Sequence, residues 1–567
     1  MSRSASRWIW LPLTALAALY MWNDLAWMVA DQAPLLGEDS IRHTQRVLNH
    51  WHHLRLEPSW ETFWWPNYYP PFGAWVIFLH FAAFGASVEM MQHSQVVFTG
   101  LLVLGTGTLC GRIWGSWAGV AAATLSVGFP FWWQQHDHIM LEIPATAVLV
   151  LAISLQPSPK EPDRWLRTVL GALAFGFALL SHKTTAYALL PMSAWLGGRA
   201  IVDIVRHRNK QAALHLAEVL VYGLGALLLL PWLLLSSELL EETLTRVRTE
   251  QQGTLPFRLM VGMAAWGKHA FFLPHHVWAI GLGAFAVPFG VRRSPLLIPT
   301  LLAIAGVPFL LEFAWIHERY FLIAAPLTIV VMLAPIGLLT RAERPQLRWA
   351  GRALTVPVGL FGLFFALAWH SPERLPDATM DIRYGGFDHA DPNRPLEDNM
   401  PLIWAIPVRY AWALAPPFDK RWTYRPVAEA LAELSEEPEH LLRPLSSPGS
   451  GDEYPKNDKQ DPVVRVLDPP NEVEYLQAEL ISLNRTQFNV PRRSRKNKKP
   501  GQGPGTVSLS CPSVAGCYVI EMEASSDGSS LQADKLEAAG YSAVATVPLF
   551  EHDPRNPDFA IIWATQP

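Results

Sequence analysis

Charge and cysteine are scarce in this chain of 567 residues. Only 17% of its residues are charged, whereas about a quarter are charged in an average soluble protein, so the composition argues against a purely cytosolic enzyme. Its three cysteines exclude a disulfide-dense secreted scaffold and a zinc ribbon built on cysteine alone. A net charge of −4 gives no electrostatic reason to expect a nucleic-acid partner. The chain has neither a Walker A sequence nor a glycine-rich dinucleotide fingerprint, so we find no cradle for nucleotide phosphates.

Hydrophobic residues make up 50% of the chain, and they are concentrated in its first two-thirds. Apolar runs follow one another through residues 1–370, many of them close to the roughly 20 residues that cross a bilayer. The 25 tryptophans suit membrane interfaces, where amphipathic rings gather. We predict a polytopic α-helical domain with spans near 8–30, 94–111, 115–132, 141–155, 166–181, 184–198, 215–236, 275–291, 295–313, 320–340 and 353–370.

The orientation of these spans follows from the positive charges of their connections. Alternate connections are short and basic, and they contain Arg112, Lys160, Arg164, Arg167, Arg199, Arg206, Arg208, Lys210, Arg292, Arg293, Arg341, Arg344, Arg348 and Arg352. This bias predicts a cytoplasmic N-terminus and an external C-terminal part. We expect the membrane to be a bacterial cytoplasmic membrane. The first span follows Arg3 and Arg7 and has no small-residue cleavage site, so we interpret it as an uncleaved anchor.

The apolar segment 71–87 does not fit this topology. Counting it as a span would reverse every later connection and place the basic ones outside. We therefore expect a re-entrant or interfacial helix within a long first external loop, residues 31–93. If a second short helix paired with it also crossed the membrane, the later connections would keep their sides, and segment 71–87 could be a true crossing.

Residues 371–567 have the composition of a water-soluble domain. Helices are predicted at 425–436 and 529–540, and strands at 463–467, 517–521, 543–549 and 559–564, which together suggest a small external α/β domain. The polar stretches 444–462 and 492–505 are expected to be mobile loops. Arg492 to Lys499 form a basic run that either meets lipid phosphates or is simply solvated. A disulfide between Cys511 and Cys517 is left open.

Carboxylates follow directly after the first span, which makes the first external loop the best candidate for chemistry. Glu38 and Asp39 stand before an amphipathic stretch, and an acid just above the membrane can accept a proton from a sugar acceptor. The alternative is a helix N-cap for a helix that begins near Ser40. Asp24 and Asn23, near the outer end of the first span, are expected to face protein or a cavity, because a lipid-facing aspartate is costly.

The order of short motifs carries a resemblance. After the acidic pair come Tyr-Pro-Pro at 69–71, Asp137 in QQHDHIMLEIP, and HERYFLIAAP at 317–326. Over roughly residues 8–340 the chain resembles the polytopic GT-C glycosyltransferases. It is most similar to the protein O-mannosyltransferase family, which includes the lipid A aminoarabinose transferases. The resemblance implies a first-loop aspartate as catalytic base or acceptor-positioning group, a polyprenyl-phosphate sugar as donor and a cavity at the outer membrane surface. The family often has Asp-Glu where this chain has Glu38-Asp39, which leaves open which of the two acts.

Roles for single residues follow from the resemblance and from the needs of the chemistry. Asp39 is the predicted base, with Glu38 second, and Asp137 either holds the acceptor or is an ordinary loop residue. The departing phosphate needs positive charge, for which we favour Arg319 because its planar fork can bind two oxygens. The other predicted substrate-binding residues are Lys268, Lys183, Tyr320, His317 and Tyr69. Tyr320 also fits the role of an interfacial aromatic anchor, and Lys183 that of a lysine snorkelling to the interface.

Histidines on the predicted outer side raise the question of a metal. They are His50, His52, His53, His136, His138, His275, His276 and His317. Their spacing matches no established zinc site, so no metal and no other cofactor is predicted, although a divalent cation held between loops stays an alternative.

The sequence therefore predicts an inverting glycosyltransferase that moves a hexosyl or pentosyl group from a polyprenyl-phosphate donor to a protein, glycan or lipid acceptor. Membrane lipids are its other expected partners, and nucleic acid is not among them. A transporter or flippase of lipid-linked sugars is the first alternative, but such proteins place binding groups near the bilayer midplane, often between repeated halves. A polysaccharide polymerase or ligase is the second alternative.

Overall fold

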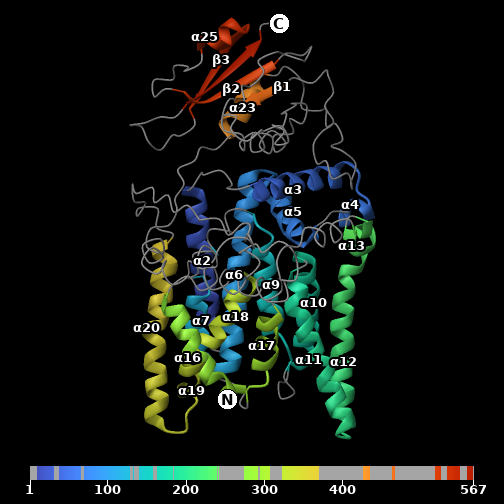
Figure 1. Ribbon diagram of the computed structural model, residues 1–567, viewed down its shortest axis with the longest axis vertical. Helices are drawn as coiled ribbons and strands as arrows, with labels where there is room; N and C mark the ends of the chain where they lie inside the picture. The colour runs from blue at the N-terminus through green and yellow to red at the C-terminus, as the bar shows by residue number, and fades with distance from the viewer. Residues whose placement is uncertain are drawn as a thin grey trace, which may run out of the picture. The chain divides into compact units, whose positions relative to one another are not determined.

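The computed structural model describes residues 9–30, 38–65, 69–127, 132, 139–157, 163–182, 184–238, 240–241, 274–291, 294–306, 322–369, 425–434, 463–466, 517–524, 533–548 and 559–565 (Figure 1). The chain divides into two compact units, which are described separately. Unit 1 comprises residues 1–30, 66–75 and 93–418, and unit 2 comprises residues 31–65, 76–92 and 419–567.

Unit 1 is helical, and its helices coincide with the predicted spans. Their bounds are α2 (Trp10–Ala30), α6 (Val88–Trp114, which enters the unit at His93), α7 (Ser116–Leu125), α9 (Glu142–Ser154), α10 (Arg164–Ser181), α11 (Thr185–Val205), α12 (Asn209–Ala226), the short η1 (Leu227–Leu229), α13 (Leu230–Leu235), α16 (Pro274–Val291), α17 (Leu297–Gly306), α18 (Ala325–Met332), α19 (Ala334–Thr340) and α20 (Pro345–Trp369). Within the described residues, five helical segments are long and apolar enough to cross a membrane: α6, α10, α11, Asn209–Leu235 and Leu322–Thr340. The chain is an integral membrane protein, and the predicted polytopic fold is confirmed.

Two predicted spans differ from the helices in an informative way. The span predicted at 320–340 is broken into α18 and α19, because Pro335 stands in the first turn of α19, where its missing N–H and fixed φ favour a helix start. The span predicted at 353–370 begins earlier, at Pro345, so the basic residues Arg348 and Arg352 belong to α20 itself. Hydropathy alone reveals neither boundary.

Glycine allows close packing between α10 and α12, which run side by side in Figure 1. A Cβ atom built on Gly176 would lie 2.3 Å from the carbonyl oxygen of Gly225, and one built on Gly225 would lie 2.2 Å from that of Ala172. No side chain fits between backbones this close. Small residues of this kind are typical of helix contacts inside membranes, where packing replaces the hydrophobic effect.

Residues 31–65 and 76–92 of unit 2 contain two helices, α3 (Glu38–Leu56) and α4 (Trp60–Trp64), and most of α5 (Phe72–Phe84). Ser59 caps α4, because its hydroxyl accepts a hydrogen bond from the Thr62 backbone N–H at 3.0 Å. Helix α5 has 13 residues, which at about 1.5 Å per residue gives about 20 Å, less than the roughly 30 Å of hydrocarbon in a bilayer. This length favours the re-entrant or interfacial interpretation of residues 71–87.

The remainder of unit 2 is a small α/β fold, as predicted. Strands β1 (Val463–Val466), β2 (Cys517–Ala524), β3 (Tyr541–Pro548) and β4 (Phe559–Thr565) form one sheet in the order β1-β2-β4-β3. Strands β1 and β2 are parallel, and the other neighbours are antiparallel. Helix α23 (Arg425–Leu434) buries Val427, Ala428 and Leu431 on one face. Helix α25 (Ala533–Ala538) ends two residues before the predicted end, because Gly540 turns the chain into β3 with φ of 85°.

Candidate functional site

The predicted acidic pair lies at the start of a helix. Helix α3 begins at Glu38, so Glu38 and Asp39 both belong to its first turn, two residues before the start we predicted near Ser40. The backbone N–H groups of a first turn have no partner within the helix, and they point toward the positive end of the helix dipole. This position stabilises ionised carboxylates. The side chains of residues 38–42 lie outside the described part of the structure.

The histidines of α3 are buried, and His50 has the contacts of a packed side chain. Nε2 of His50 lies 2.7 Å from the carbonyl oxygen of Thr62, which can only accept, so this nitrogen carries the proton and donates. The ring stacks on Trp65 with centroids 4.9 Å apart and meets the edge of Phe78 at 4.7 Å. Burial lowers the pKa of His50 to about 3. In the described residues no group of three His, Cys, Asp or Glu side chains is placed to hold a metal ion.

Tyr69 meets His182 in unit 1, and this contact joins two motifs that are far apart in the sequence. Tyr69 is half-buried, His182 is 2% exposed, and their ring centroids are 6.0 Å apart. Next to them Phe72 stacks on Phe177 of α10 at 4.8 Å. The Tyr-Pro-Pro segment therefore lies along the end of α10 that the predicted topology places outside.

The connection between α10 and α11, residues SHKTT at 181–185, is held by its own polar groups. The hydroxyl of Thr185 lies 2.8 Å from the Ala178 carbonyl oxygen and 2.7 Å from that of His182, within hydrogen-bonding distance of both. Thr184 directs its backbone N–H at Nδ1 of His182 at 3.2 Å, and its hydroxyl oxygen lies 2.6 Å from the same nitrogen. His182, Thr184 and Thr185 are all buried. The two described neighbours of Lys183 are thus fixed in place.

Asp24 faces protein, which confirms one sequence expectation. Its side chain is fully buried, and the Thr99 hydroxyl of α6 donates to Oδ2 at 2.9 Å. Tyr20, one turn earlier on α2, donates its hydroxyl to the Thr124 carbonyl oxygen at 3.2 Å. These bonds link α2 to its neighbours through polar groups.

Several predicted site residues lie outside the described part of the chain. They are Asp137, Lys183, Lys268, His317, Arg319 and Tyr320, and the same holds for His136, His138, Cys511, the side chains of His275, His276 and Cys517, and the loops 444–462 and 492–505. The convergence of Asp39 and Arg319 on one cavity stays a prediction. Cys110 is a free, buried cysteine.

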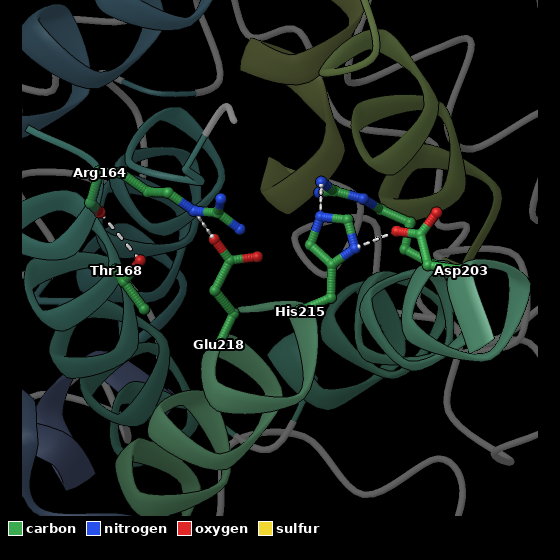
Figure 2. A network of polar contacts seen from close by, with 6 residues as sticks. Arg164, Thr168, Asp203, His215 and Glu218 are labelled. Atoms are coloured by element: carbon green, nitrogen blue, oxygen red, sulfur yellow. Dashed lines mark hydrogen bonds and ion pairs between the residues drawn. The ribbon is translucent and has the colours of Figure 1, made fainter. Parts of the chain in front are cut away.

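A second polar cluster lies at the opposite end of α10 and α11, the end that the predicted topology places on the cytoplasmic side. Figure 2 shows Glu218 of α12 pointing to Arg164 of α10, with Oε1 2.5 Å from Nε. Their side chains are 2% and 11% exposed. We used Arg164 only to orient the spans and did not single out Glu218. The sequence does contain a signal for this pair: Glu218 is an acid within an otherwise apolar span, and burying an acid there without a partner is costly.

His215 completes this cluster by linking α12 to α11. Its Nε2 lies 2.6 Å from Nη2 of Arg199, and its Nδ1 lies 2.8 Å from Oδ2 of Asp203 (Figure 2). A guanidinium group only donates and a carboxylate only accepts, so the proton sits on Nδ1 and the ring is neutral. The cluster holds three helices together, and the exposed Arg208 adds a third arginine, with Nη1 3.7 Å from Oδ1 of Asp203.

Comparisons with known proteins give matches among solved structures. No protein-family model and no curated protein matches the chain. It is similar to ArnT from Cupriavidus metallidurans in the apo state, with 14% identity and a TM-score of 0.47 over 99% of this chain and 98% of that one. The same protein bound to undecaprenyl phosphate has 14% identity to this chain and a TM-score of 0.48, over 98% of each chain.

A second similar enzyme is the archaeal oligosaccharyltransferase AglB from Archaeoglobus fulgidus in complex with an inhibitory peptide and a dolichol-phosphate. Its identity is 12% and its TM-score 0.46, over 98% of this chain and 76% of that one. Both enzymes are GT-C glycosyltransferases, the group that the sequence resembles.

Proposed function

We propose that this protein is an inverting glycosyltransferase that transfers a sugar from a polyprenyl-phosphate donor to an acceptor at the outer face of the membrane. The observation that carries the proposal is the contact between Tyr69 and His182. It brings the Tyr-Pro-Pro segment, a predicted substrate-binding element, to the turn that contains Lys183, a predicted phosphate ligand. Undecaprenyl phosphate and dolichol-phosphate, which are bound in two of the similar structures, belong to the proposed class of lipid.

The reaction needs only groups that the chain supplies. An acceptor oxygen attacks the anomeric carbon, its proton passes to Asp39 or Glu38, and the bond from that carbon to the phosphate oxygen breaks. The electron pair leaves with the polyprenyl phosphate, where a cation such as Lys183 or Arg319 stabilises the added charge. A single displacement of this kind inverts the anomeric centre. The first turn of α3 suits the ionised base, because the helix dipole favours a carboxylate there.

Three finer points complete the proposal. The sugar is a hexose or pentose, and the acceptor is a protein, glycan or lipid. The protein lies in a bacterial cytoplasmic membrane with its N-terminus inside, and its C-terminal α/β part is external. The density of Lys and Arg in alternate connections supports this orientation.

The test uses purified full-length protein and a polyprenyl-phosphate sugar, with release of polyprenyl phosphate as the readout. We expect Asp39→Asn to lower the rate by about 100-fold or more, the range typical of losing a general base. Glu38→Gln is the second variant, and Glu61→Gln is the matched control, because Glu61 is an exposed acid of the same loop. If neither Asp39→Asn nor Glu38→Gln slows release, the proposed site is wrong. Counterflow of the lipid-linked sugar in proteoliposomes without release would favour a transporter.

A further inference from the structure

We infer that His182 is a positioning residue for the donor phosphate: its neutral ring sets the orientation of Tyr69 and fixes the chain on either side of Lys183. This inference rests on the proposed function and deepens it. His182 was not among the residues singled out from the sequence, although it directly precedes Lys183.

The protonation state of His182 follows from its hydrogen bonds. The Thr184 backbone N–H can only donate, and it points at Nδ1 from 3.2 Å. Nδ1 therefore carries a lone pair, and the Thr184 hydroxyl, 2.6 Å away, donates to it as well. The ring is neutral with its proton on Nε2. A proton on Nδ1 would face the amide proton of Thr184 and open the turn.

His182 is held through its ring at Nδ1 and through its backbone carbonyl group, so it is a rigid support. The carbonyl oxygen of His182 accepts from the Thr185 backbone N–H at 3.0 Å and also lies near the Thr185 hydroxyl. The residue itself is 2% exposed. A side chain fixed in this way loses little entropy when it orients a neighbour, and a tyrosine ring beside it has fewer orientations to choose from.

Tyr69 is held at two points. Its own ring lies against His182 at 6.0 Å with an interplanar angle of 32°, and three residues later Phe72 stacks on Phe177. Phe177 belongs to the last turns of α10, directly before the SHKTT turn. The Tyr-Pro-Pro segment and the turn are thus built on the same helix end, and His182 is the side chain that belongs to the turn and touches the segment.

The experiment separates the two roles of His182 with two substitutions. His182→Phe keeps a ring against Tyr69 and removes the acceptor for Thr184, whereas His182→Asn keeps a short polar acceptor and removes the ring. Ser181→Ala is the matched control, because Ser181 is buried in the same turn and its hydroxyl bonds only to the Phe177 carbonyl oxygen at 2.7 Å. Each variant is purified as the full chain, and its melting temperature is recorded.

We expect both His182 variants to raise the KM for the polyprenyl-phosphate sugar about tenfold, the scale of a substrate group misplaced by less than an ångström. The KM for the acceptor should stay the same, and Ser181→Ala should leave both values unchanged. Thr184→Ser, which keeps the hydroxyl, should behave like the wild type, and Thr184→Val should follow His182→Phe. A donor KM within twofold of wild type in both His182 variants overturns the inference, as does an equal rise in Ser181→Ala.

A second readout does not depend on activity. The rate at which an amine-reactive reagent modifies Lys183, followed by mass spectrometry, should change at least threefold in His182→Phe and stay constant in Ser181→Ala. If the wild type releases no polyprenyl phosphate, the proposed function fails, and the labelling rate alone decides whether His182 fixes the turn. An unchanged labelling rate in His182→Phe counts against the inference in either case.

Discussion

Three of the described histidines, His50, His182 and His215, have different polar environments, and in each one the partner decides which nitrogen carries the proton. His50 donates to a carbonyl group through Nε2. His182 accepts from an amide through Nδ1. His215 accepts from Arg199 through Nε2 and presents Nδ1 to Asp203. The hydrogen bond made by one ring nitrogen of an imidazole decides whether the other nitrogen carries the proton. An added proton would therefore break a hydrogen bond at His182 and at His215. At His50 burial would oppose the added proton.

His50 provides a pH-dependent prediction. Its folded pKa of about 3 lies below the unfolded value of about 6.5, so between these values the unfolded chain binds more protons. Stability therefore falls as the pH drops from about 6.5 toward about 3, by up to about 1.4 kcal/mol per pH unit. We expect the melting temperature of the wild type to fall more steeply from pH 7 to pH 5 than that of His50→Gln.

The control for this prediction is His80→Gln, because His80 is only half-buried and bonds within its own helix. That variant should keep the wild-type slope. Parallel slopes for the wild type and His50→Gln would show that His50 does not contribute.

At the scale of elements, α10 and α12 are joined twice, by glycine contacts and by the ionic cluster, and the cluster also includes α11. The first junction brings backbones together without side chains, and the second ties charged side chains across the same helices. The ionic contacts are buried, so removing one partner of a pair and leaving the other should lower the stability of the protein. A single unpaired charge left in a buried site costs more than the pair contributes.

Removal of one member of the Arg164–Glu218 pair should therefore destabilise the protein strongly. We expect Glu218→Gln and Arg164→Gln each to cost about 3 kcal/mol or more, seen as a lower melting temperature of the purified protein. The double variant should cost less than the sum of the two. Arg167→Gln is the control, since Arg167 pairs with Asp163, whose side chain is 44% exposed, and such pairs contribute at most about 1 kcal/mol. Additive losses in the double variant would argue against a coupled pair.

The glycine contact gives a separate prediction for the same helices. Gly176→Leu should push α10 away from α12 and prevent stable folding, because even a Cβ atom there would lie 2.3 Å from the Gly225 carbonyl oxygen. Gly223→Ala is the matched substitution on α12, where nothing lies within 4 Å. It should be neutral or stabilise by up to about 1 kcal/mol. The yield of monodisperse protein in detergent measures both, and equal yields would show that the contact is not required.

The elements that could be predicted are those with a regular pattern. Strand alternation revealed all four described strands, and the apolar face of α23 revealed that helix. The break at Leu333 was missed because hydropathy does not register a proline at a helix start. The site was harder to predict because no local sequence pattern links its residues. Tyr69 belongs to a recognisable motif, whereas its partner His182 belongs to a turn more than a hundred residues later. Glu218 was not predicted because it lies within an apolar span and not in a connection between spans.

At the scale of the whole molecule, the topology depends on whether α5 crosses the membrane. Its 13 residues and the basic connections both argue against a crossing. Glu61 precedes α5 and Glu89 follows it, and both are exposed. Lys210, exposed at the start of α12, belongs to the connections that we place inside.

Single cysteines at these three positions test the arrangement in intact cells. We expect Glu61→Cys and Glu89→Cys to react with a thiol reagent that cannot cross the membrane, and Lys210→Cys to react only after permeabilisation. Cys511 and Cys517 are replaced by serine in the background, and Cys110 is buried. Reaction of Glu61→Cys but not of Glu89→Cys in intact cells would show that α5 crosses after all.

The bond between Asp24 and Thr99 has a consequence for how the protein is made. Asp24 belongs to α2, and its partner Thr99 is synthesised 75 residues later. Until α6 arrives, the carboxyl group lacks this partner, and an unpaired aspartate that faces lipid is costly. We therefore expect α2 to complete its insertion together with α6, as a pair, and the order of synthesis to become part of the folding pathway.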